Sequence, residues 1–323
     1  MVRENVSKDS LESDAFLIWT PEVGRSVAVG ADRRTLPLPR IPLPVHREDV
    51  SDDGPSDDAI GRGLYDYLRQ FPDCPYNADY AELLREAYPH YLADLGAQIV
   101  LLDSKEVDAP YIHRKITYMK ILSLLDPGNG GLLQRLGMAC YDIGHMFSEL
   151  GFSRCHFLAA MGYFQRSLKC LPGDPTSLNY LGQIDFILGD YPGAARYWAA
   201  VISAMDEGAA REGLRQRISR IEAREVPDHP LVDDLEAIGE AMALYGKGEI
   251  REARTILDSL EEKGTVPAEF PSPEFYYLLG MCRGKEGEVG GAFEAFEKSL
   301  ELDPDYAPAR EGKDRLLQEG GRL

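Results

Sequence analysis

The sequence predicts an all-α fold in which helix–turn–helix repeats stack into an α-solenoid, preceded by an extended N-terminal arm. Three observations support this prediction. Apolar residues recur at helical spacing from Ala59 almost to the C-terminus, and three short segments in the second half of the chain align with one another. The first 58 residues differ from the rest, because they are rich in proline and in acidic residues.

The composition allows a large hydrophobic core and limits the kinds of partner. Of the 323 residues, 44% are hydrophobic, which excludes wholesale disorder. Lys and Arg total 35 against 54 Asp and Glu, so the formal net charge is −19. Nucleic acids and anionic membrane surfaces attract a positive face, so this charge argues against both. No run approaches the roughly 18 apolar residues of a membrane-spanning helix, and the N-terminal MVRENVSKDSLESD lacks the apolar core of a signal peptide.

Residues 1–58 are predicted to form an extended arm without a core of its own. Two short β-like runs, FLIW at residues 16–19 and SVAV at 26–29, precede the segment TLPLPRIPLPV at 35–45. Its closely spaced prolines prevent a helix and favour an extended, polyproline-like chain. The acidic, turn-rich run EDVSDDGPSDD ends the arm. Two interpretations stay open: a disordered tail, or a tail that lies on a partner or on the protein's own helices.

Helical patterns begin at Ala59. The first helix is predicted to end before Pro72, after apolar residues at helical spacing. A second helical segment covers residues 77–102, and Pro89 is expected to kink or break it. A third covers residues 111–126 and stops at a Pro-Gly pair.

The second half of the chain repeats a short pattern: glycine, acid, apolar residue, two variable residues, alanine. The three copies begin at Gly189, Gly248 and Gly287, and each lies between two helical runs. Around the third copy, the residues at fixed intervals are Tyr276, Leu279, Gly280, Ala292, Phe296 and Pro304. Around the first copy, the same intervals hold Leu178, Leu181, Gly182, Ala194 and Trp198. This pattern resembles the tetratricopeptide repeat, a 34-residue helix–turn–helix unit, and the resemblance implies a right-handed solenoid.

The spacing of large and small residues has a physical cause in the packing of two helices. Gly182 and Gly280 are expected where the second helix of a repeat crosses the first closely, because a side chain there would push the helices apart. Trp198 and Phe296 are expected to fill the gap toward the next repeat. The three turn glycines are expected to reverse the chain, since positive φ costs glycine little.

Extending the same register predicts less regular units and a linear organisation. In the segment 130–174, Gly137 and Phe164 lie 27 residues apart, whereas Gly280 and Phe296 lie 16 apart, so an insertion is expected around residues 142–155. The predicted organisation is an arm (1–58), a helical part with a degenerate repeat (59–129), two repeats of which the first carries the insertion (130–208), an extra helix and linker (209–233), two repeats (234–306), and a capping helix and tail (307–323).

No sequence motif for catalysis or phosphate binding is present, so we expect no enzyme activity and no cofactor. The five cysteines are odd in number and lack a C-x-x-C pair, which predicts reduced, buried thiols in a cytoplasmic protein. The nearest approach to a metal cluster consists of Cys140, His145, Cys155 and His156. Their spacing matches no zinc pattern, so we expect core cysteines with surface histidines and no metal.

Arginines form a stripe on the helix predicted at residues 209–225, which lies outside the 34-residue register. They are Arg211, Arg215, Arg217, Arg220 and Arg224. Glutamates interleave with them, which favours a solvated face of mixed charge. The alternative is a docking strip for an acidic partner.

The family resemblance implies a concave groove, lined by the first helix of each repeat, that holds a peptide or partner segment. The matching positions here are Gln134, Met138, Tyr141, Asn179, Gln183, Phe186, Tyr245, Tyr277 and Met281. Aromatic, methionine and amide side chains suit adaptable contact with an extended chain. Ordinary packing between helices is the alternative for Phe186 and Met281. Chaperone-binding members of the family hold a C-terminal carboxylate with a Lys/Asn/Arg clamp, and the absence of the lysine here argues against that clamp.

Two functional hypotheses follow from the repeats and the arm. The first is a non-enzymatic protein–protein interaction module, an adaptor, scaffold or assembly factor that binds a partner segment in the groove. The alternative is a ligand- or partner-regulated sensor whose groove is covered by its own arm, through the preordered LPLPRIPLP at residues 36–44. An enzyme is the third reading, and no motif supports it.

Overall fold

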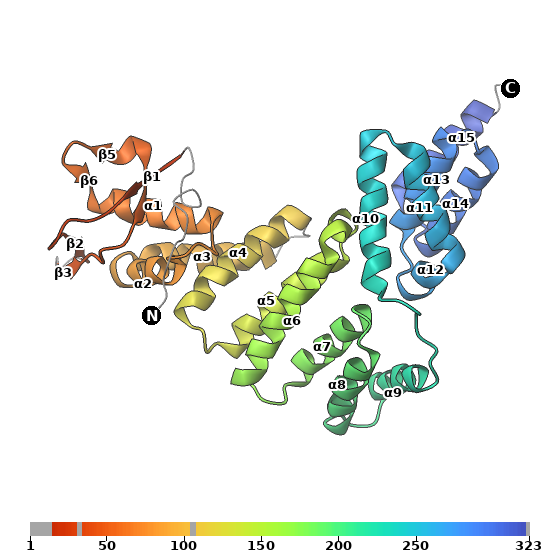
Figure 1. The fold of residues 1–323 in the computed structure, drawn as a ribbon, viewed down its shortest axis with the longest axis horizontal. Coiled ribbons are helices and arrows are strands. Elements are labelled where there is room, and N and C mark those ends of the chain that lie inside the picture. The colour runs from red at the N-terminus through yellow and green to blue at the C-terminus, as the bar shows by residue number, and fades with distance from the viewer. Residues whose placement is uncertain (1–14, 31–33, 104–107, 321–323) are drawn as a thin grey trace. The chain divides into compact units, whose positions relative to one another are not determined.

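The computed structural model describes residues 15–30, 34–103 and 108–320 (Figure 1). The chain forms two compact units that divide between Ala139 and Cys140, inside helix α5 (Gly130–His145). This division falls within a segment predicted as two repeats, and the finer predicted boundaries remain predictions. Within the described ranges, no helix carries an apolar run long enough to cross a membrane. The N-terminal residues predicted to lack a signal peptide lie outside the described residues.

The arm forms three small antiparallel sheets (Figure 1). β1 (Phe16–Trp19) pairs with β4 (Leu43–His46), β2 (Ser26–Val29) with β3 (Arg34–Pro37), and β5 (Val50–Ser51) with β6 (Gly54–Pro55). Both β-like runs of the sequence are therefore strands. The proline-rich segment 35–45 also contributes to strands, although the sequence predicted a polyproline-like chain. A strand of a two-stranded sheet has one unpaired edge, where a residue without an N–H group is tolerated.

The arm packs on the helices of its own unit. Phe16 is fully buried, and its ring meets Tyr67 edge to face with the ring centroids 5.2 Å apart. Tyr67 belongs to helix α1 (Asp57–Gln70). Gly63 on the same helix has no side chain, so β4 can pack closely there. A Cβ at this position would collide with the carbonyl oxygen of Pro44. The described part of the arm is thus a tail that lies on the protein's own helices.

The helices of the first unit follow the sequence pattern. Ser56 caps α1, since its hydroxyl oxygen accepts a hydrogen bond of 3.2 Å from the Ala59 N–H. The helices that follow are α2 (Asn77–Ala87), α3 (Pro89–Asp103), α4 (Ala109–Leu125) and the first part of α5. The break expected at Pro89 is confirmed, because α2 ends two residues before it and α3 begins on it, where a missing N–H costs least.

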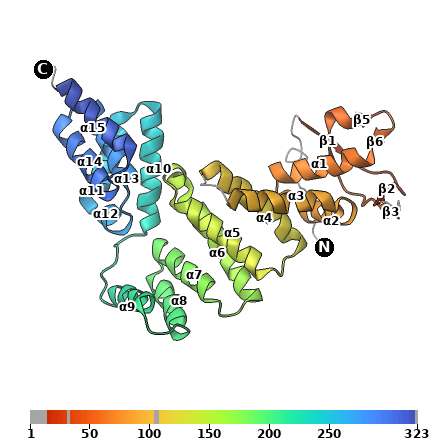
Figure 2. The ribbon, with the colours of Figure 1, turned by 180° about the vertical axis from the view of Figure 1, so that it is seen from behind.

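The second unit consists of helices joined by short turns and is seen from behind in Figure 2. After α5 come α6 (Ser153–Cys170), α7 (Pro175–Ile187), α8 (Tyr191–Ser203), α9 (Ala209–Glu222), α10 (Leu231–Lys247), α11 (Ile250–Lys263), α12 (Thr265–Glu269), α13 (Pro273–Lys285), α14 (Val289–Leu302) and α15 (Ala307–Gly320). Helices α7 and α8, α10 and α11, and α13 and α14 pack as pairs. These stacked pairs confirm the α-solenoid fold class predicted from the sequence.

The close crossings predicted from the repeat spacing are present. A Cβ at Gly182 on α7 would stand 2.5 Å from the Trp198 Nε1 on α8, and one at Gly280 on α13 would stand 2.7 Å from Phe296 on α14. Each large side chain therefore occupies the space left by the glycine of its own pair. Phe296 also faces the next helix, because a Cβ at Gly312 on α15 would come 2.7 Å from the same ring.

The predicted insertion connects parts of the second unit that are far apart in the sequence. It completes α5 and forms a short 3-10 helix, Phe147–Phe152, that packs on α10. Gly151 and Gly239 meet there so closely that a Cβ at position 239 would collide with the backbone of the 3-10 helix. Arg154, at the start of α6, forms ion pairs with Asp233 and Glu236 of α10. The inserted residues thus fasten α10 to the start of α6.

The C-terminal helix α15 packs on α14 and α13, and its role as a cap stays a prediction. Ala292, Phe296 and Ala309 form a buried cluster. Ala309 comes from α15, and Leu316 of the same helix packs against the cluster. Residues 321–323, at the end of the predicted tail, lie outside the described residues.

Candidate functional site

The nine residues predicted to line a groove are all half-buried. Gln134 and Met138 lie on the part of α5 that belongs to the first unit. The other seven belong to the second unit: Tyr141 on α5, Asn179, Gln183 and Phe186 on α7, Tyr245 on α10, and Tyr277 and Met281 on α13. Four of the residues of the second unit line two adjoining hollows beside α7. These two hollows form the candidate site.

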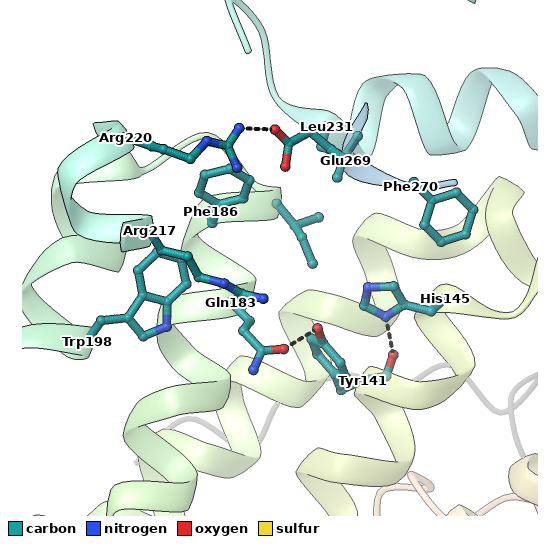
Figure 3. Close-up of a pocket in the computed structure, with 11 residues that line it drawn as sticks. Tyr141, His145, Gln183, Phe186, Trp198, Arg217, Arg220, Leu231, Glu269 and Phe270 are labelled. Atoms are coloured by element: carbon teal, nitrogen blue, oxygen red, sulfur yellow. Dashed lines mark hydrogen bonds and ion pairs between the residues drawn. The ribbon is translucent and has the colours of Figure 1, made fainter. Parts of the chain in front are cut away.

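The first hollow, called here the aromatic cavity, has a volume of about 210 Å³ (Figure 3). Its walls come from α5, α7, α8, α9, the start of α10 and the end of α12. The lining residues are Tyr141, His145, Gln183, Phe186, Ile187, Trp198, Arg217, Arg220, Leu231, Glu269 and Phe270. Elements on both sides of the linker between α9 and α10 thus meet at one cavity.

Hydrogen bonds fix the polar side chains on the α5 wall of the aromatic cavity. The Tyr141 hydroxyl donates to the Gln183 Oε1 at 2.5 Å, and burial raises the pKa of the Tyr141 phenol. The His145 Nδ1–H donates to the Tyr141 carbonyl oxygen at 3.0 Å, which leaves Nε2 as an acceptor. Burial lowers the pKa of His145 below its usual 6.5. The imidazole is therefore neutral at pH 7.

Two arginines of α9 reach the aromatic cavity in different ways. Arg220 forms an ion pair with Glu269, whose side chain is only 14% exposed. The Arg217 guanidinium lies over the Trp198 ring, with Cζ 5.5 Å from the ring centroid. Figure 3 shows Arg217 extending past the indole toward Gln183. Within the part of the chain that the structure describes, Arg217 forms no ion pair with a carboxylate.

The second hollow, called here the apolar groove, lies between α7 and α9 and has a volume of about 510 Å³. Its lining residues are Pro175, Thr176, Asn179, Gln183, Val201, Met205, Ala210, Gly213, Leu214 and Arg217. Gln183 and Arg217 line both hollows, so the apolar groove and the aromatic cavity adjoin at these two side chains.

The remaining predicted residues of the second unit lie away from the two hollows. Tyr277 packs against Phe296 and Tyr306, with ring centroids 5.9 and 5.8 Å apart. Met281 packs against the same C-terminal cluster and also lines a hollow between α13 and α15. Tyr245 lies under Lys285, whose Nζ is 4.4 Å from the ring centroid.

Four of the five arginines of the stripe form two groups, while Arg224 lies beyond the end of α9 and lines neither hollow. Arg211 and Arg215 form ion pairs of 3.0 Å with Glu207, as expected for a solvated face of mixed charge. Arg217 and Arg220 instead line the aromatic cavity. Both Arg217 and Arg220 were noticed in the sequence as part of the stripe, but nothing in the sequence showed that α9 turns them toward α7.

Other lining residues gave weaker signals in the sequence. Glu269 and Phe270 lie at the end of α12, a short helix outside the repeat register. Leu231 begins α10, which the inserted 3-10 helix fastens to α6. The repeat pattern alone could not predict these contacts, because α12 and the inserted 3-10 helix lie outside it.

The cysteines and histidines near the insertion have separate environments. Cys140 is buried as expected, but Cys155 is exposed. The histidines are half-buried rather than on the surface: His145 lines the aromatic cavity, and the His156 Nε2 lies 3.6 Å from Glu149. Elsewhere, burial raises the pKa of the Cys74 and Cys282 thiols to about 11, so these thiols stay protonated at neutral pH.

The similarities to known proteins are confined to solved structures. No protein-family model matches the sequence, and no curated protein matches it either. Among solved structures, the chain is similar to the tetratricopeptide repeat protein TTC0263 of Thermus thermophilus, with 19% identity and a TM-score of 0.25 over 58% of this chain and 99% of that one. It is also similar to a tetratricopeptide repeat protein of Parabacteroides merdae, with 13% identity and a TM-score of 0.27 over 81% and 93%.

A third solved structure, MamA of Desulfovibrio magneticus from residue 41 to its end, has 18% identity and a TM-score of 0.20 over 58% of this chain and 93% of that one. The helix pairs of the second unit, with a glycine at each of the two close crossings, have the packing expected of tetratricopeptide-like repeats.

Proposed function

We propose that the second unit is a non-enzymatic protein–protein interaction module that holds a partner segment along α7. In this role the protein would act as an adaptor, scaffold or assembly factor. The observation that carries the proposal is that the apolar groove and the aromatic cavity adjoin at Gln183 and Arg217. Together they offer a path longer than either hollow, with α7 as its common wall.

The chemistry of the path suits an extended peptide. Val201, Met205 and Leu214 provide apolar surface in the groove, and methionine adapts its shape to different side chains. Asn179 lines the same groove with an amide that both donates and accepts hydrogen bonds, as the backbone of an extended segment requires. Such a mixture of apolar and amide groups is typical of a binding surface rather than of a reaction centre.

Among its described lining residues, the aromatic cavity lacks the nucleophile of a Ser–His or Cys–His hydrolase. His145 is its only histidine among the described lining residues, and no serine, threonine or cysteine lines the cavity with it. The Nδ1–H of His145 donates to a backbone carbonyl rather than to a carboxylate. We therefore assign the cavity to binding.

Affinity purification with quantitative mass spectrometry tests the proposal. The variant Asn179→Ala/Leu214→Ala removes one amide and one apolar side chain from the groove wall. If each contact contributes about 1 kcal/mol, recovery of specific partners should fall about tenfold or more. Gln216→Ala, an amide-to-alanine change at an exposed position of α9, is the matched control. The proposal is wrong if the double variant keeps its circular dichroism spectrum and recovers the same partners as the unaltered chain.

A further inference from the structure

We propose that Arg217 binds the side-chain carboxylate of an Asp or Glu inside the partner segment, at the point where the segment passes from the apolar groove to the aromatic cavity. This inference rests on the proposed function and names the chemistry of its partner. Of the arginines considered as a docking strip for an acidic partner, the proposal assigns the contact to Arg217 alone.

The charges around Arg217 support this assignment. Its neighbours on α9 have carboxylate partners: Arg215 pairs with Glu207, and Arg220 pairs with Glu269. Arg217 has no such partner among the described residues, although the chain holds 54 acidic residues against 35 Lys and Arg. Because Arg217 lines both hollows, its charge faces the space that a ligand would enter. A carboxylate is the group that complements a guanidinium most closely.

The Trp198 indole orients the guanidinium for this contact. Trp198 is 1% exposed, and its edge is held against Gly182. Arg217 lies over the indole with Cζ 5.5 Å from the ring centroid. Stacking on an aromatic face uses the flat side of the guanidinium and leaves its N–H groups free at the edge. The arginine is therefore positioned before the ligand arrives, which reduces the entropy lost on binding.

The position of Arg217 between two hollows favours an internal acidic residue over a C-terminal carboxylate. The apolar groove continues on one side of it and the aromatic cavity on the other. A chain that ended at Arg217 would leave one of the two hollows empty. A segment that continues in both directions fills both, so the acidic residue should have apolar neighbours on each side.

The size of the aromatic cavity limits what enters it. Its volume of about 210 Å³ lies below the roughly 300–1,000 Å³ of pockets that hold drug-sized molecules. One side chain of a peptide is the occupant that this space suits. Phe186, Leu231 and Phe270 line the cavity, so that side chain should be apolar or aromatic.

Peptide display on the full-length chain tests the assignment. The probe is a random 12-residue library with linkers at both ends, so that no peptide terminus is free, and a second library presents free C-termini. The selections use the unaltered chain, Arg217→Gln, and the control Arg215→Gln. Arg215 lies on the same helix, pairs with Glu207 and Glu212, and lines neither hollow.

We expect the linker-flanked library to yield peptides with Asp or Glu at one fixed position between apolar residues. Because the net charge of −19 disfavours acidic peptides in general, acid at one position is a specific result. Arg217→Gln should abolish the acidic preference, keep the apolar ones, and weaken a selected peptide about tenfold. Arg215→Gln should leave both unchanged.

Three results would overturn the proposal. Selected peptides without a fixed acidic position, or with the same acidic position on Arg217→Gln, would show that Arg217 does not bind a carboxylate. Enrichment of free C-termini alone would assign the contact to a chain terminus. If no peptide is enriched on any variant, the proposed function fails and this inference fails with it.

Discussion

The edge of the Trp198 indole lies directly over Gly182, so that a Cβ at position 182 would stand 2.5 Å from the indole nitrogen. This contact joins the two helices of one repeat, and its counterpart joins Gly280 to Phe296. Trp198 is 1% exposed, so a shift of its ring would disturb buried packing on α7 and α8. The glycine is therefore a packing requirement at this crossing.

Gly182→Ala should destabilise the second unit by about 1–3 kcal/mol, because overpacking forces side chains or backbone from their preferred positions. Urea unfolding followed by tryptophan fluorescence measures the effect. Gly162→Ala, on α6, is the matched control, since a Cβ there meets nothing within 4 Å. That control should be neutral or more stable by up to about 1 kcal/mol. Equal stability of the two variants would contradict the close crossing.

Gly239→Ala should separate α10 from the inserted 3-10 helix. The obstacle is the backbone of Gly151, which cannot rotate away as a side chain can, so we expect a loss of about 2 kcal/mol or more. Hydrogen exchange should quicken over α10 while α13 keeps its protection. Gly246→Ala lies on the same helix in open space and serves as the control. Unchanged exchange over α10 would show that the insertion does not fasten it.

The sequence predicted the repeats well because their packing depends on local spacing. Gly182 and Trp198, and Gly280 and Phe296, lie 16 residues apart in both pairs, and any helical hairpin of this length brings such residues together. The break at Pro89 also follows from the chemistry of one residue. Features of this kind need no knowledge of distant segments.

The candidate site could be predicted only in part, because its walls come from segments far apart in the chain. Tyr141, Gln183 and Phe186 were expected from the repeat register. Arg217 was noticed only as part of a charged stripe, and Phe270 gave no signal at all. Arg217 lies on α9, which packs on α8 outside the 34-residue register, and Phe270 follows α12, which packs on α10 and α11. The repeat pattern describes neither helix. The sequence did not predict that the proline-rich segment 35–45 contributes to strands, because its prolines favour a polyproline-like chain over the pairing between β1 and β4.

Leu43→Ala should loosen the arm from α1. Leu43 is fully buried in β4, which packs on α1, and a buried leucine truncated to alanine costs about 2–5 kcal/mol. We expect faster hydrogen exchange in α1 and α2, with the second unit unaffected. Val23→Ala is the matched control, because Val23 is 81% exposed. If α1 exchanges its amide hydrogens equally slowly in both variants, the arm does not stabilise the first unit.

Asp185 and Asp190 place two carboxyl groups near each other at the turn between α7 and α8. Asp190 is used as a cap, since its Oδ1 accepts a hydrogen bond of 2.9 Å from the Gly193 N–H. Asp185 is buried at the end of α7. Burial, and secondarily the charge of Asp190, raise the pKa of Asp185 from 3.8 to about 6.

Asp185→Asn should therefore stabilise the protein at pH 7.5 and leave its stability nearly unchanged at pH 3.5. A carboxyl group whose pKa is higher in the folded state binds its proton more tightly there, so it disfavours folding increasingly as the pH rises from about 4 to 6. The difference is worth up to about 3 kcal/mol above pH 6. Thermal unfolding of Asp185→Asn at several pH values measures it, with the exposed Asp314→Asn as control. A stabilisation that does not grow between pH 4 and 6 would show that Asp185 ionises in the folded protein as it does in the unfolded chain.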